Sequence, residues 1–300
     1  MTDVAAVIGN FNGEPYLADC IASLQAQESP PTEIVVVDGG SVDGGVSLAK
    51  RLGARVVERP NLGLGHLYNV GVAETAAEHV FLANNDIALE PRCLERLSRA
   101  LEDDEGAFAA DARQLDWDGV RTIHARTTLT RGRMLHEYLP GLHLDPNVPA
   151  DEISATVCAN AAAMLVRRSM FRELGGFDET FFMEWEDLDL CWRGWLRGWR
   201  TLYVPDAVVR HRVGAVTTAP LQPRRSASSH HNLVRFALKC LPREAALRVV
   251  IGELLRLPAH PRAVVLGLVG VIGELPEIIR ARRGMENGVR VLQSMLVGEA

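Results

Sequence analysis

The chain has 300 residues, of which 47% are apolar and 23% are charged, so it can bury a sizeable core in one large domain or two modest ones. This composition excludes a mainly disordered protein. The net charge of −6 is unevenly spread, because residues 200–300 carry 15 Lys+Arg against 7 Asp+Glu. The basic last third favours an anionic partner such as a membrane surface. Nucleic acid is disfavoured, since the basic residues are diluted among Leu, Val and Ala and no binding motif is present.

The cysteines and the apolar segments bear on the compartment. Five cysteines, an odd number, are widely spaced and never form a C-x-x-C pair, which indicates buried thiols in a reducing compartment. Thr2-Asp3 leads directly into a strand pattern, so we expect no signal peptide. The uncharged run from Ala263 to Gly273 is too short to span a bilayer of roughly 30 Å. We expect a cytoplasmic protein whose membrane contact, if it has one, is peripheral on the inner face of the plasma membrane.

Strand and helix patterns alternate four times in the first third of the chain. Apolar runs predict strands, and apolar residues at helical spacing predict helices between them and after Pro91. The strands are expected over residues 4–8, 34–37, 54–57 and 80–83. This alternation predicts an α/β fold with a doubly wound, mainly parallel sheet. Because right-handed crossovers put the strand ends on one side, Asn10, Asp38 and Asp86 should converge on one crevice.

The rest of the chain is less regular. We expect residues 111–155 to be irregular and to lie on the acceptor side of a site. Its three unclustered histidines, His124, His136 and His143, are more typical of surface residues than of metal ligands. Further predictions are two strands flanking a turn at Pro205-Asp206, and a basic amphipathic helical tail over 223–300 that prolines cut into short helices. The remaining expected elements are a strand over 156–166, a helix over 168–174, a helix from Glu186, and strands over 201–204 and 207–211.

The stretch Val80–Asp86 is a candidate ligand site, because four apolar or small residues run straight into two amides and a carboxylate. A carboxylate at the end of a central strand lies in the crevice where open α/β sheets bind ligands. The alternative is a turn or helix cap, since Pro91 begins a helix soon afterwards.

Seven motifs in order resemble those of family 2 glycosyltransferases of the GT-A fold, within them the bacterial rhamnosyltransferase-like branch. The resemblance covers about residues 4–212, and more loosely Asn232-Leu233-x-Arg235. The motifs are Asn10-Phe11-Asn12-Gly13, Val35-Val36-Val37-Asp38-x-x-Ser41-x-Asp43-Gly44, Asn61-Leu62-Gly63 with Asn69-x-Gly71, Leu82-Ala83-Asn84-Asn85-Asp86, Gly175-Gly176-Phe177-Asp178-Glu179, Glu186-Asp187-x-Asp189-Leu190-x-x-Arg193, and Pro205-Asp206 with His211.

This resemblance implies a GT-A, Rossmann-like domain over 1–222 that binds a nucleotide-sugar and carries the catalytic residues. It implies that Asp38 contacts the nucleobase, with Phe11 and Asn12 lining the same pocket. A turn or cap role for Asp38 stays open. The remaining implied donor-binding residues are Ser41, Asp43, Asn61, Asn69 and Asn85.

The resemblance also implies a divalent cation, Mg²⁺ or Mn²⁺, held by Asp86 and by the donor phosphates. His211 matches a histidine that adds a nitrogen ligand or touches the diphosphate, and a purely structural role is the alternative. The catalytic base is expected at Glu186-Asp187, and we favour Asp187. A helix N-terminus should keep its pKa low and the carboxylate ionised. The alternative is that acidic residues simply favour the first turn of a helix.

Several positions depart from the family pattern. Gly39 stands where relatives usually have Asn, which removes a ribose contact. Ala83-Asn84-Asn85 replaces the commoner tip of the fourth strand, and Asn160 occupies a position often held by Gly. His66-Leu67-Tyr68 is bulkier than usual and could change which sugar fits. None of these departures removes the metal or base carboxylates.

We therefore expect a metal-dependent inverting glycosyltransferase that moves a sugar, for example from dTDP-L-rhamnose, to a glycan or polyprenyl-linked acceptor. A sugar-1-phosphate nucleotidyltransferase would need a basic loop after the first strand, and Asn10–Glu14 lacks one. A Rossmann dehydrogenase is disfavoured because Gly63-x-Gly65 has no third glycine at the required spacing. An inactive nucleotide-sugar-binding scaffold stays open. The Leu/Val-rich tail could contact a membrane or form a homodimer interface, and the sequence favours neither.

Overall fold

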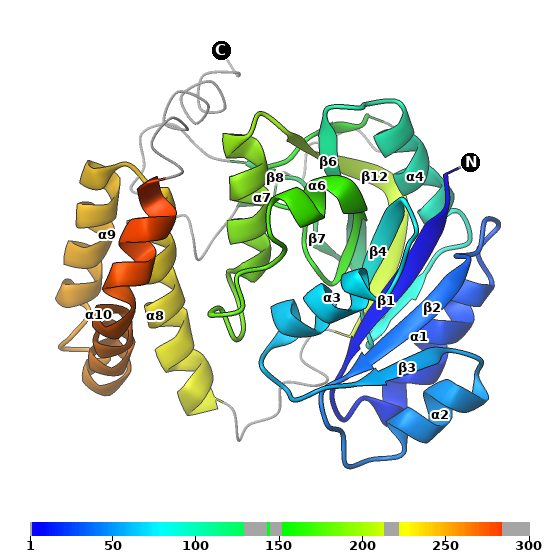
Figure 1. Cartoon of the computed structure of the whole chain (residues 1–300), viewed down its shortest axis with the longest axis horizontal. Helices are drawn as coiled ribbons and strands as arrows, with labels where there is room; N and C mark the ends of the chain where they lie inside the picture. Colours follow the sequence, from blue (N-terminus) through cyan, green and yellow to red (C-terminus); the bar gives the residue numbers. More distant parts are fainter. Residues whose placement is uncertain (1, 129–142, 145–151, 213–221, 284–300) are drawn as a thin grey trace.

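The computed structural model describes residues 2–128, 143–144, 152–212 and 222–283. One large sheet forms the centre, helices cover both of its faces, and α8, α9 and α10 stand beside α7 (Figure 1). The strands are β1 (Val4–Asn10), β2 (Glu33–Asp38), β3 (Arg55–Glu58), β4 (His79–Asn84), β5 (Ile87–Leu89), β6 (Ala107–Asp116), β7 (Thr122–His124), β8 (Thr127–Thr128), β9 (His143–Leu144), β10 (Ser154–Ala155), β11 (Ala163–Arg167) and β12 (Arg200–His211). The helices are α1 (Glu14–Gln25), α2 (Gly45–Arg51), α3 (Leu64–Ala73), α4 (Cys93–Glu102), α6 (Arg168–Glu173), α7 (Glu186–Leu196), α8 (Gln222–Cys240), α9 (Arg243–Leu255) and α10 (Pro261–Arg283).

The sheet has the order β10-β12-β6-β11-β4-β1-β2-β3 and is mixed but mainly parallel along this path. β4, β1, β2 and β3 pair in parallel, as do β6 and β12, whereas β11 runs antiparallel to both β4 and β6. The predicted alternation of strands and helices is confirmed for the first four strands. Asn10 pairs with Asp38 in the register of β1 and β2, so both side chains lie at the same end of the sheet.

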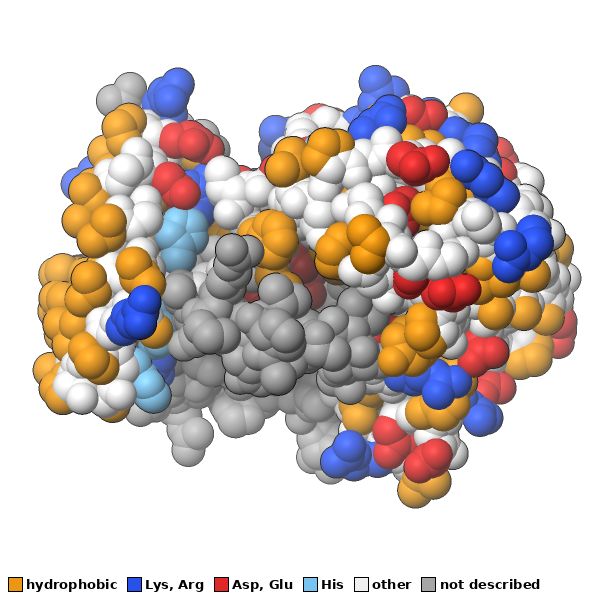
Figure 2. All heavy atoms as spheres, turned by 90° about the horizontal axis from the view of Figure 1, so that it is seen from below, with side chains coloured by type: hydrophobic (Ala, Val, Ile, Leu, Met, Phe, Trp, Pro, Cys, Tyr) orange, Lys and Arg blue, Asp and Glu red, His pale blue; other side chains and the backbone are white. Residues whose placement is uncertain are grey.

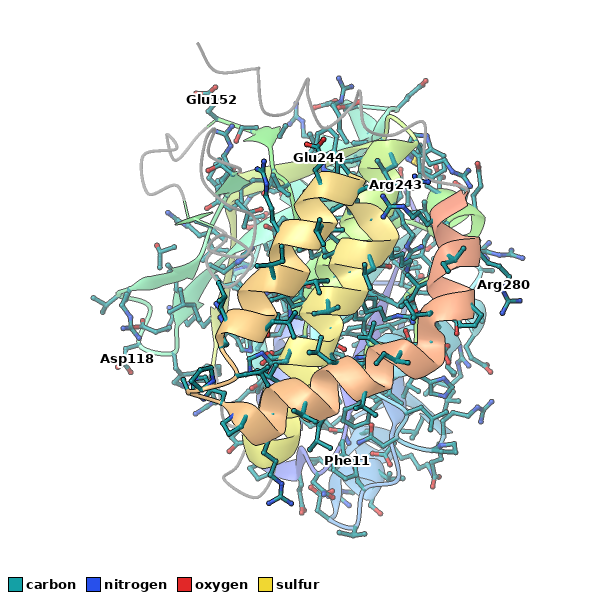
Figure 3. All side chains as sticks on the ribbon, turned by 90° about the vertical axis from the view of Figure 1, so that its left-hand side faces the viewer. Phe11, Asp118, Glu152, Arg243, Glu244 and Arg280 are labelled. Carbon is teal, nitrogen blue, oxygen red and sulfur yellow. The ribbon has the colours of Figure 1, made fainter. Side chains whose placement is uncertain are left out.

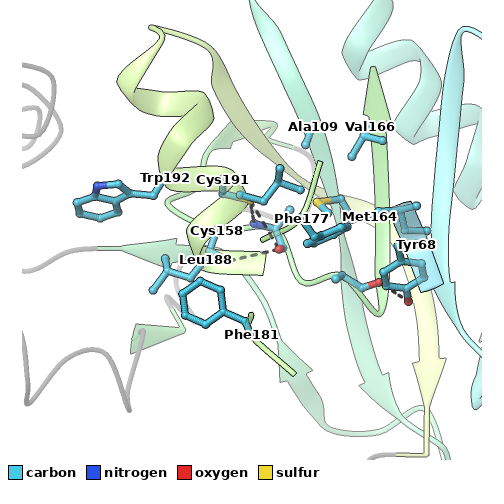
Figure 4. Packing of buried hydrophobic residues seen from close by; sticks show 14 of the residues in the cluster. Tyr68, Ala109, Cys158, Met164, Val166, Phe177, Phe181, Leu188, Cys191 and Trp192 are labelled. Atoms are coloured by element: carbon cyan, nitrogen blue, oxygen red, sulfur yellow. Dashed lines mark hydrogen bonds between the residues drawn. The ribbon is translucent and has the colours of Figure 1, made fainter. Parts of the chain in front are cut away.

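Side-chain alternation along the strands divides the core into two layers. Val7, Val35 and Val37 pack on one face of the sheet against α3 and α7, and Ala6 and Val36 pack on the other face against α1 and α4. Because these strands are buried on both faces, they read as continuous apolar runs in the sequence. The first of these layers continues into α8 through Leu233 and Phe236. Figure 4 shows the part of this layer around Tyr68, Phe177, Phe181 and α7.

Three secondary-structure predictions were wrong. The segment 111–155 is not irregular at its start, because β6 extends to Asp116 and β7 pairs with it. The strand expected over 156–166 is limited to β11, since residues 156–162 form a loop. Pro205-Asp206 does not end a strand, because β12 continues through it with a shift of register between Val204 and Val208. The tertiary pairing of β12 with β6 overrides the local turn signal.

The helices after residue 222 follow the proline pattern only in part. Pro242 lies between α8 and α9, and Pro258 lies between α9 and α10. Pro276 was wrongly expected to end a helix, because it lies inside α10. A proline removes one backbone hydrogen bond and bends a helix instead of ending it when packing holds both halves. Figure 3 shows this bend in α10, which lies across α8.

Buried ion pairs join α8 to α7 and to the loop before it. Lys239 Nζ lies 2.7 Å from both Asp178 Oδ2 and Asp189 Oδ1, and Arg235 Nη2 lies 3.1 Å from Asp178 Oδ2. Arg193 Nε completes the cluster at 2.7 Å from Asp189 Oδ2. Burial alone would raise the pKa of Asp178, but Lys239 and Arg235 hold it well below its usual range. The positive charges of α8 are therefore partly used inside the molecule.

Candidate active site

Asn10 and Asp38 form the centre of a buried hydrogen-bond network at the ends of β1 and β2. Asn10 Nδ2 donates to Asp38 Oδ1 at 2.7 Å, and Asn85 Nδ2 donates to Asn10 Oδ1 at 2.7 Å. Asp38 also accepts from the amides of Gly40 and Ser41 and from Ser41 Oγ. All the acceptor directions of the Asp38 carboxylate are thus in use. A contact to a nucleobase stays a prediction, and it requires one of these bonds to open.

The same network ties the loop after β1 to the loop after β2. Ser41 Oγ accepts from the amide of Asn12 at 2.8 Å, and Asn12 Oδ1 accepts from the amide of Val42 at 2.9 Å. Asp43 accepts from the amides of Glu14 and Gly45, at the starts of α1 and α2. The structure brings Asn12, Ser41 and Asp43 together, as expected, and gives Asp43 a capping role. Contacts of these three residues with a nucleotide-sugar stay predictions.

Close backbone approach at Gly13 fixes the position of Asn85. A Cβ on Gly13 would lie 1.9 Å from Asn85 Nδ2 and 2.4 Å from Asn10 Oδ1, so only glycine fits. Asn61 lies beside the end of β2, since a Cβ on Gly39 would meet its Cβ at 3.2 Å. Phe11 lies on the same loop as Gly13 and is 37% exposed, so its ring is open to a ligand.

Asn69 is engaged elsewhere. Its Nδ2 donates to the carbonyl of Phe177 at 3.0 Å and to Glu179 Oε1 at 2.8 Å, and its Oδ1 accepts from the amide of Phe177. His66 Nδ1 approaches the other oxygen of Glu179 at 2.8 Å. These contacts hold the loop after α6 against α3. Contact between Asn69 and a nucleotide-sugar stays a prediction, because in this structure the Asn69 side chain makes its hydrogen bonds within the protein.

Asp86 and His211 face each other at the ends of β4 and β12. His211 Nε2 lies 3.2 Å from Asp86 Oδ1, and both side chains are at most one-tenth exposed. His211 Nδ1 lies 2.8 Å from Gln114 Oε1, and an amide oxygen can only accept, so the proton of the neutral ring sits on Nδ1. The lone pair of Nε2 is then directed at Asp86. Gln114 was missed from the sequence because it lies in the segment expected to be irregular.

The Asp86–His211 pair fits a divalent cation. Asp86 Oδ1 is buried and makes no hydrogen bond with the described part of the chain, which fits an atom that could bind a cation. A carboxylate oxygen and an imidazole nitrogen suit Mn²⁺, and one or two carboxylates with substrate phosphates suit Mg²⁺. Among the described residues, no group of three or more His, Cys, Asp or Glu is arranged to hold a metal. Remaining ligands would therefore come from substrate and water.

Tyr68 is a buried residue near both the Asp86–His211 pair and the expected catalytic base. Its hydroxyl donates to Asn84 Oδ1 at 3.0 Å and lies 2.9 Å from the carbonyl of Ala161. Burial raises the pKa of Tyr68 well above its ordinary value, and the negative charges of Glu186, Asp86 and Asp187 raise it further. All three carboxyl groups are thus near enough to Tyr68 for their charges to act on its hydroxyl. Figure 4 shows Tyr68 at the edge of the apolar layer that also holds Leu188 of α7.

Glu186 and Asp187 begin α7, but their pKa values are not low. Burial raises the pKa of Glu186 to about 8, and repulsion from Asp187 adds to the effect. Burial also raises the pKa of Asp187, although the amide of Leu188, which donates to its Oδ1 at 2.8 Å, opposes the shift. The expectation that the helix N-terminus keeps these carboxyls acidic was wrong, because removal from water outweighs the helix dipole. Glu186 Oε2 is buried without a hydrogen-bond partner.

His124 is a further site residue that the sequence interpretation assigned to the surface. Its side chain is 12% exposed, and Nε2 lies 2.8 Å from Oδ2 of the fully buried Asp111, on the neighbouring strand β6. Burial lowers the pKa of His124, but Asp111 and Asp187 raise it above its ordinary value. His124 is thus near enough to Asp187 for the two groups to affect each other's pKa. The other two histidines cannot be placed in the same way, because His136 and the side chain of His143 lie outside the described residues.

The sequence matches the family described as Glycosyl transferase family 2 over residues 5–175, more than half of the chain. The chain belongs to this family. It is a rhamnosyltransferase-like glycosyltransferase, similar to two proteins named as rhamnosyltransferases. It is 30% identical over 255 residues to an N-acetylglucosaminyl-diphospho-decaprenol L-rhamnosyltransferase of Mycobacterium tuberculosis, covering 77% of this chain and 82% of that protein. It is 31% identical over 157 residues to the rhamnosyltransferase WbbL of Escherichia coli, covering 48% and 58% of the two chains.

A solved structure supports the GT-A fold. The mannosyltransferase PcManGT from Pyrobaculum calidifontis, in complex with GDP-Man and Mn²⁺, superposes with a TM-score of 0.57 at 17% sequence identity. The match covers 100% of this chain and 90% of that one. At this identity the likeness concerns the fold alone. The expected α/β, GT-A architecture is confirmed.

The raised pKa of Glu186 predicts a pH-dependent stability. A carboxyl that binds its proton more tightly when folded costs stability as the pH rises from its ordinary value of 4.5 to about 8. We expect Glu186→Gln to gain roughly 1 to 3 kcal/mol of unfolding free energy over wild type between pH 5 and pH 8, at about 1.4 kcal/mol per pKa unit. Denaturant unfolding at both pH values measures this. Glu244→Gln, on an exposed turn of α9, is the control. A constant difference between Glu186→Gln and wild type would contradict the prediction.

Proposed function

We propose that this chain is an inverting, cation-dependent glycosyltransferase that moves L-rhamnose from dTDP-L-rhamnose to a lipid-linked acceptor. The observation that carries the proposal is the contact of Asp86 with His211 at 3.2 Å, beside two adjacent carboxyls, Glu186 and Asp187, at the start of α7. Asp86, Glu186 and Asp187 are all near enough to Tyr68 for their charges to raise its pKa. One pair suits a diphosphate with its cation, and the other suits removal of a proton. The site lies next to the Asn10–Asp38 network at the strand ends, where open α/β sheets bind nucleotides.

The choice of donor and acceptor is supported by a relative. The name of the M. tuberculosis protein specifies an L-rhamnosyl donor and an acceptor that carries a diphospho-decaprenol. Identity of 30% over most of both chains makes the same sugar and the same kind of acceptor the first choice here. Polysaccharide acceptors, the other expectation from the sequence, are the second choice.

The proposed reaction is a single displacement. An acceptor hydroxyl oxygen forms a bond to the sugar anomeric carbon as the bond from that carbon to the diphosphate oxygen breaks, which inverts the anomeric configuration. The acceptor proton passes to Asp187. Asp187 suits this role better than Glu186, because a group with a pKa of about 8 is mostly protonated at pH 7. Protonated Glu186 would donate a hydrogen bond from its buried, unpartnered end.

Charge on the departing diphosphate has to be neutralised near Asp86. Mg²⁺ or Mn²⁺ bound there would act as a Lewis acid on the diphosphate oxygens. Asp86 and His211 would hold the ion, and Gln114 would keep the imidazole in the tautomer that presents Nε2. The carboxylates of the site would also favour the donor with its cation bound, in which the diphosphate charge is neutralised, over the bare dianion, since like charges repel in a site of low dielectric.

Transfer can be measured directly with dTDP-, UDP- and GDP-sugars and a polyprenyl-diphospho-sugar acceptor. We expect turnover with dTDP-L-rhamnose and an inverted anomeric centre in the product. Asp187→Asn should lower kcat by about 10²- to 10⁴-fold, the usual contribution of a general base. Glu186→Gln, the matching substitution at the neighbouring residue, should lower kcat much less. A larger loss in Glu186→Gln would move the base to Glu186, and turnover of sugar-1-phosphate with a nucleoside triphosphate would favour a nucleotidyltransferase. Nucleotide binding without any turnover would favour an inactive scaffold.

Removal of the cation should abolish transfer. We expect EDTA to stop the wild-type reaction, and added Mg²⁺ or Mn²⁺ to restore it. Asp86→Asn should weaken Mn²⁺ binding in the presence of dTDP about 10-fold or more, measured by electron paramagnetic resonance of the free ion. Asp118→Asn, on an exposed turn, should bind Mn²⁺ like wild type. Full activity in EDTA, or unchanged Mn²⁺ binding by Asp86→Asn, would exclude this role.

The outer faces of α9 and α10 are the proposed membrane contact, on the cytoplasmic leaflet. None of the described helices is both long and apolar enough to cross a bilayer. Large apolar side chains are nevertheless about half exposed along both helices, and Figure 2 shows them gathered at the left edge of the molecule. They are Leu247, Ile251, Leu254 and Leu255 of α9 and Val265, Leu266, Val269, Ile272 and Ile279 of α10.

Charge favours an anionic lipid surface over a second copy of this chain as the occupant of that face. Arg243, Arg248 and Arg262 are exposed on or beside it, and none of them forms an ion pair with the described residues. Cations that flank an apolar helical face are typical of helices that lie in a membrane interface. In a dimer formed through this face, the arginines of the two copies would lie near one another and repel. The free, buried state of all five cysteines agrees with a reducing compartment.

Vesicle flotation tests this contact. We expect the protein to float with vesicles of phosphatidylcholine containing phosphatidylglycerol, and less with phosphatidylcholine alone. Leu254→Glu should reduce the bound fraction several-fold, whereas Val120→Glu, at an exposed valine of the β6–β7 turn, should not. Light scattering provides the alternative outcome. A wild-type dimer that Leu254→Glu converts to monomer, with no vesicle binding, would identify the face as a homodimer interface.

A further inference from the structure

We infer that Asn232 of α8 is a positioning residue that fixes the backbone turn from which Glu186 and Asp187 project. Its meaning for catalysis rests on the proposed function. Its structural part rests on contacts between α8 and the turn, which lie outside the matched segment 5–175. The tail is then a component of the catalytic unit as well as a membrane contact.

The turn before α7 has an unfavourable backbone conformation. Glu184 and Trp185 are consecutive residues with φ of 66° and 79°, and neither is glycine. Residues with side chains rarely adopt this left-handed region, and two in succession persist only where the surroundings enforce them. Trp185 is the residue immediately before Glu186, so its backbone sets the direction in which α7 begins. Any relaxation of this turn would move both carboxyls.

Asn232 makes the contact that enforces the turn. Its side chain is buried, and Nδ2 donates to the carbonyl of Met183 at 2.7 Å and to the carbonyl of Glu184 at 2.9 Å. An amide NH₂ has two hydrogens, so both are used on adjacent carbonyls of the strained turn. Asp or Leu at this position would be similar in size but could not donate to either carbonyl. Both carbonyls of the turn would then lose their hydrogen bonds to α8, and the backbone of the turn would be less restrained.

The helix that carries Asn232 is itself held firmly against α7. The Phe236 ring packs on Trp185 and Trp192, with centroids 5.8 Å and 5.4 Å apart. One turn further along, Lys239 bridges Asp178 and Asp189, which lie before and after the turn in the chain. Asn232 therefore acts from a fixed support. This combination of a rigid support and a bidentate contact is what positioning of a reacting group requires.

Kinetics of Asn232→Ala test the inference in the full-length protein. We expect kcat to fall about 10- to 100-fold, as for a small misplacement of a reacting group, while KM for the donor changes less than about threefold. His230→Ala is the matched control, because it removes a contact of the same helix with Glu253 of α9 and leaves Asn232 and the turn untouched. An unchanged kcat in Asn232→Ala, or an equal loss in His230→Ala, would overturn the inference.

A second substitution separates positioning from general packing. Glycine adopts positive φ without a steric cost, so Glu184→Gly should favour the turn without the help of Asn232. We expect Asn232→Ala with Glu184→Gly to recover a substantial part of the lost kcat. No recovery would mean that Asn232 acts otherwise than by holding the turn. If Asn232→Ala folds poorly, Asn232→Asp keeps the size and removes the donors, and the same outcomes apply.

Hydrogen exchange distinguishes failure of this inference from failure of the proposed function. Peptides covering residues 183–190 should exchange faster in Asn232→Ala than in wild type, and peptides of β1 and β4 should not. This readout needs no substrate. Unchanged exchange over 183–190 would overturn the positioning role even in an active enzyme. Faster exchange over 183–190 in Asn232→Ala, together with a wild-type protein that transfers no sugar, would leave the structural role standing and reject the transferase proposal.

Discussion

Neutralisation of two buried carboxylates by Lys239 is the interaction on which the arrangement of the site depends. Asp178 precedes the strained turn and Asp189 follows it, and both contact the same ammonium group at 2.7 Å. Arg193 of α7 also pairs with Asp189, but Asp178 has its cations, Lys239 and Arg235, on α8. Because an uncompensated carboxylate there would be costly, docking of α8 stabilises the loop before α7. Glu186 and Asp187, between these two, form no ion pair with a lysine or arginine of the described residues, and burial raises their pKa values. The same short segment thus contains carboxylates used for structure and carboxylates left available for chemistry.

The basic residues after position 200 also fall into two groups, some paired inside the protein and some exposed. The excess of positive charge after residue 200 suggested an external anionic partner. Arg235 and Lys239 turn out to serve internal carboxylates, whereas Arg243, Arg248 and Arg262 remain exposed. The net charge of a segment therefore overstates what it offers to a membrane. Only the part of the charge that has no internal partner contributes to binding.

The sequence predicted well what depends on local pattern. Val35–Val37 and Val80–Ala83 were recognised as strands because burial on both faces leaves continuous apolar runs, and their shared direction brought Asn10, Asp38 and Asp86 to one edge. What depends on distant partners was not predictable. Gln114 orients His211, and Asp111 pairs with His124, because β6 pairs with both β12 and β7. The periodicity of the sequence does not indicate these strand pairings. The raised pKa values follow from burial by α3 and the 160–161 loop, which a helix-terminus argument leaves out.

The shift of register in β12 has a consequence for how this site can vary. Val204 pairs with Ala112 and Val208 pairs with Arg113, so residues four apart on β12 oppose neighbours on β6 and face opposite sides of the sheet. The first half of the strand can therefore keep its core-facing order while the second half turns His211 toward Asp86. A change of one residue in the length of this segment would reverse that phase and point the imidazole away. Insertions and deletions in the segment 205–207 should therefore be tolerated only when they add or remove two residues, because only these keep His211 on the same side of the sheet.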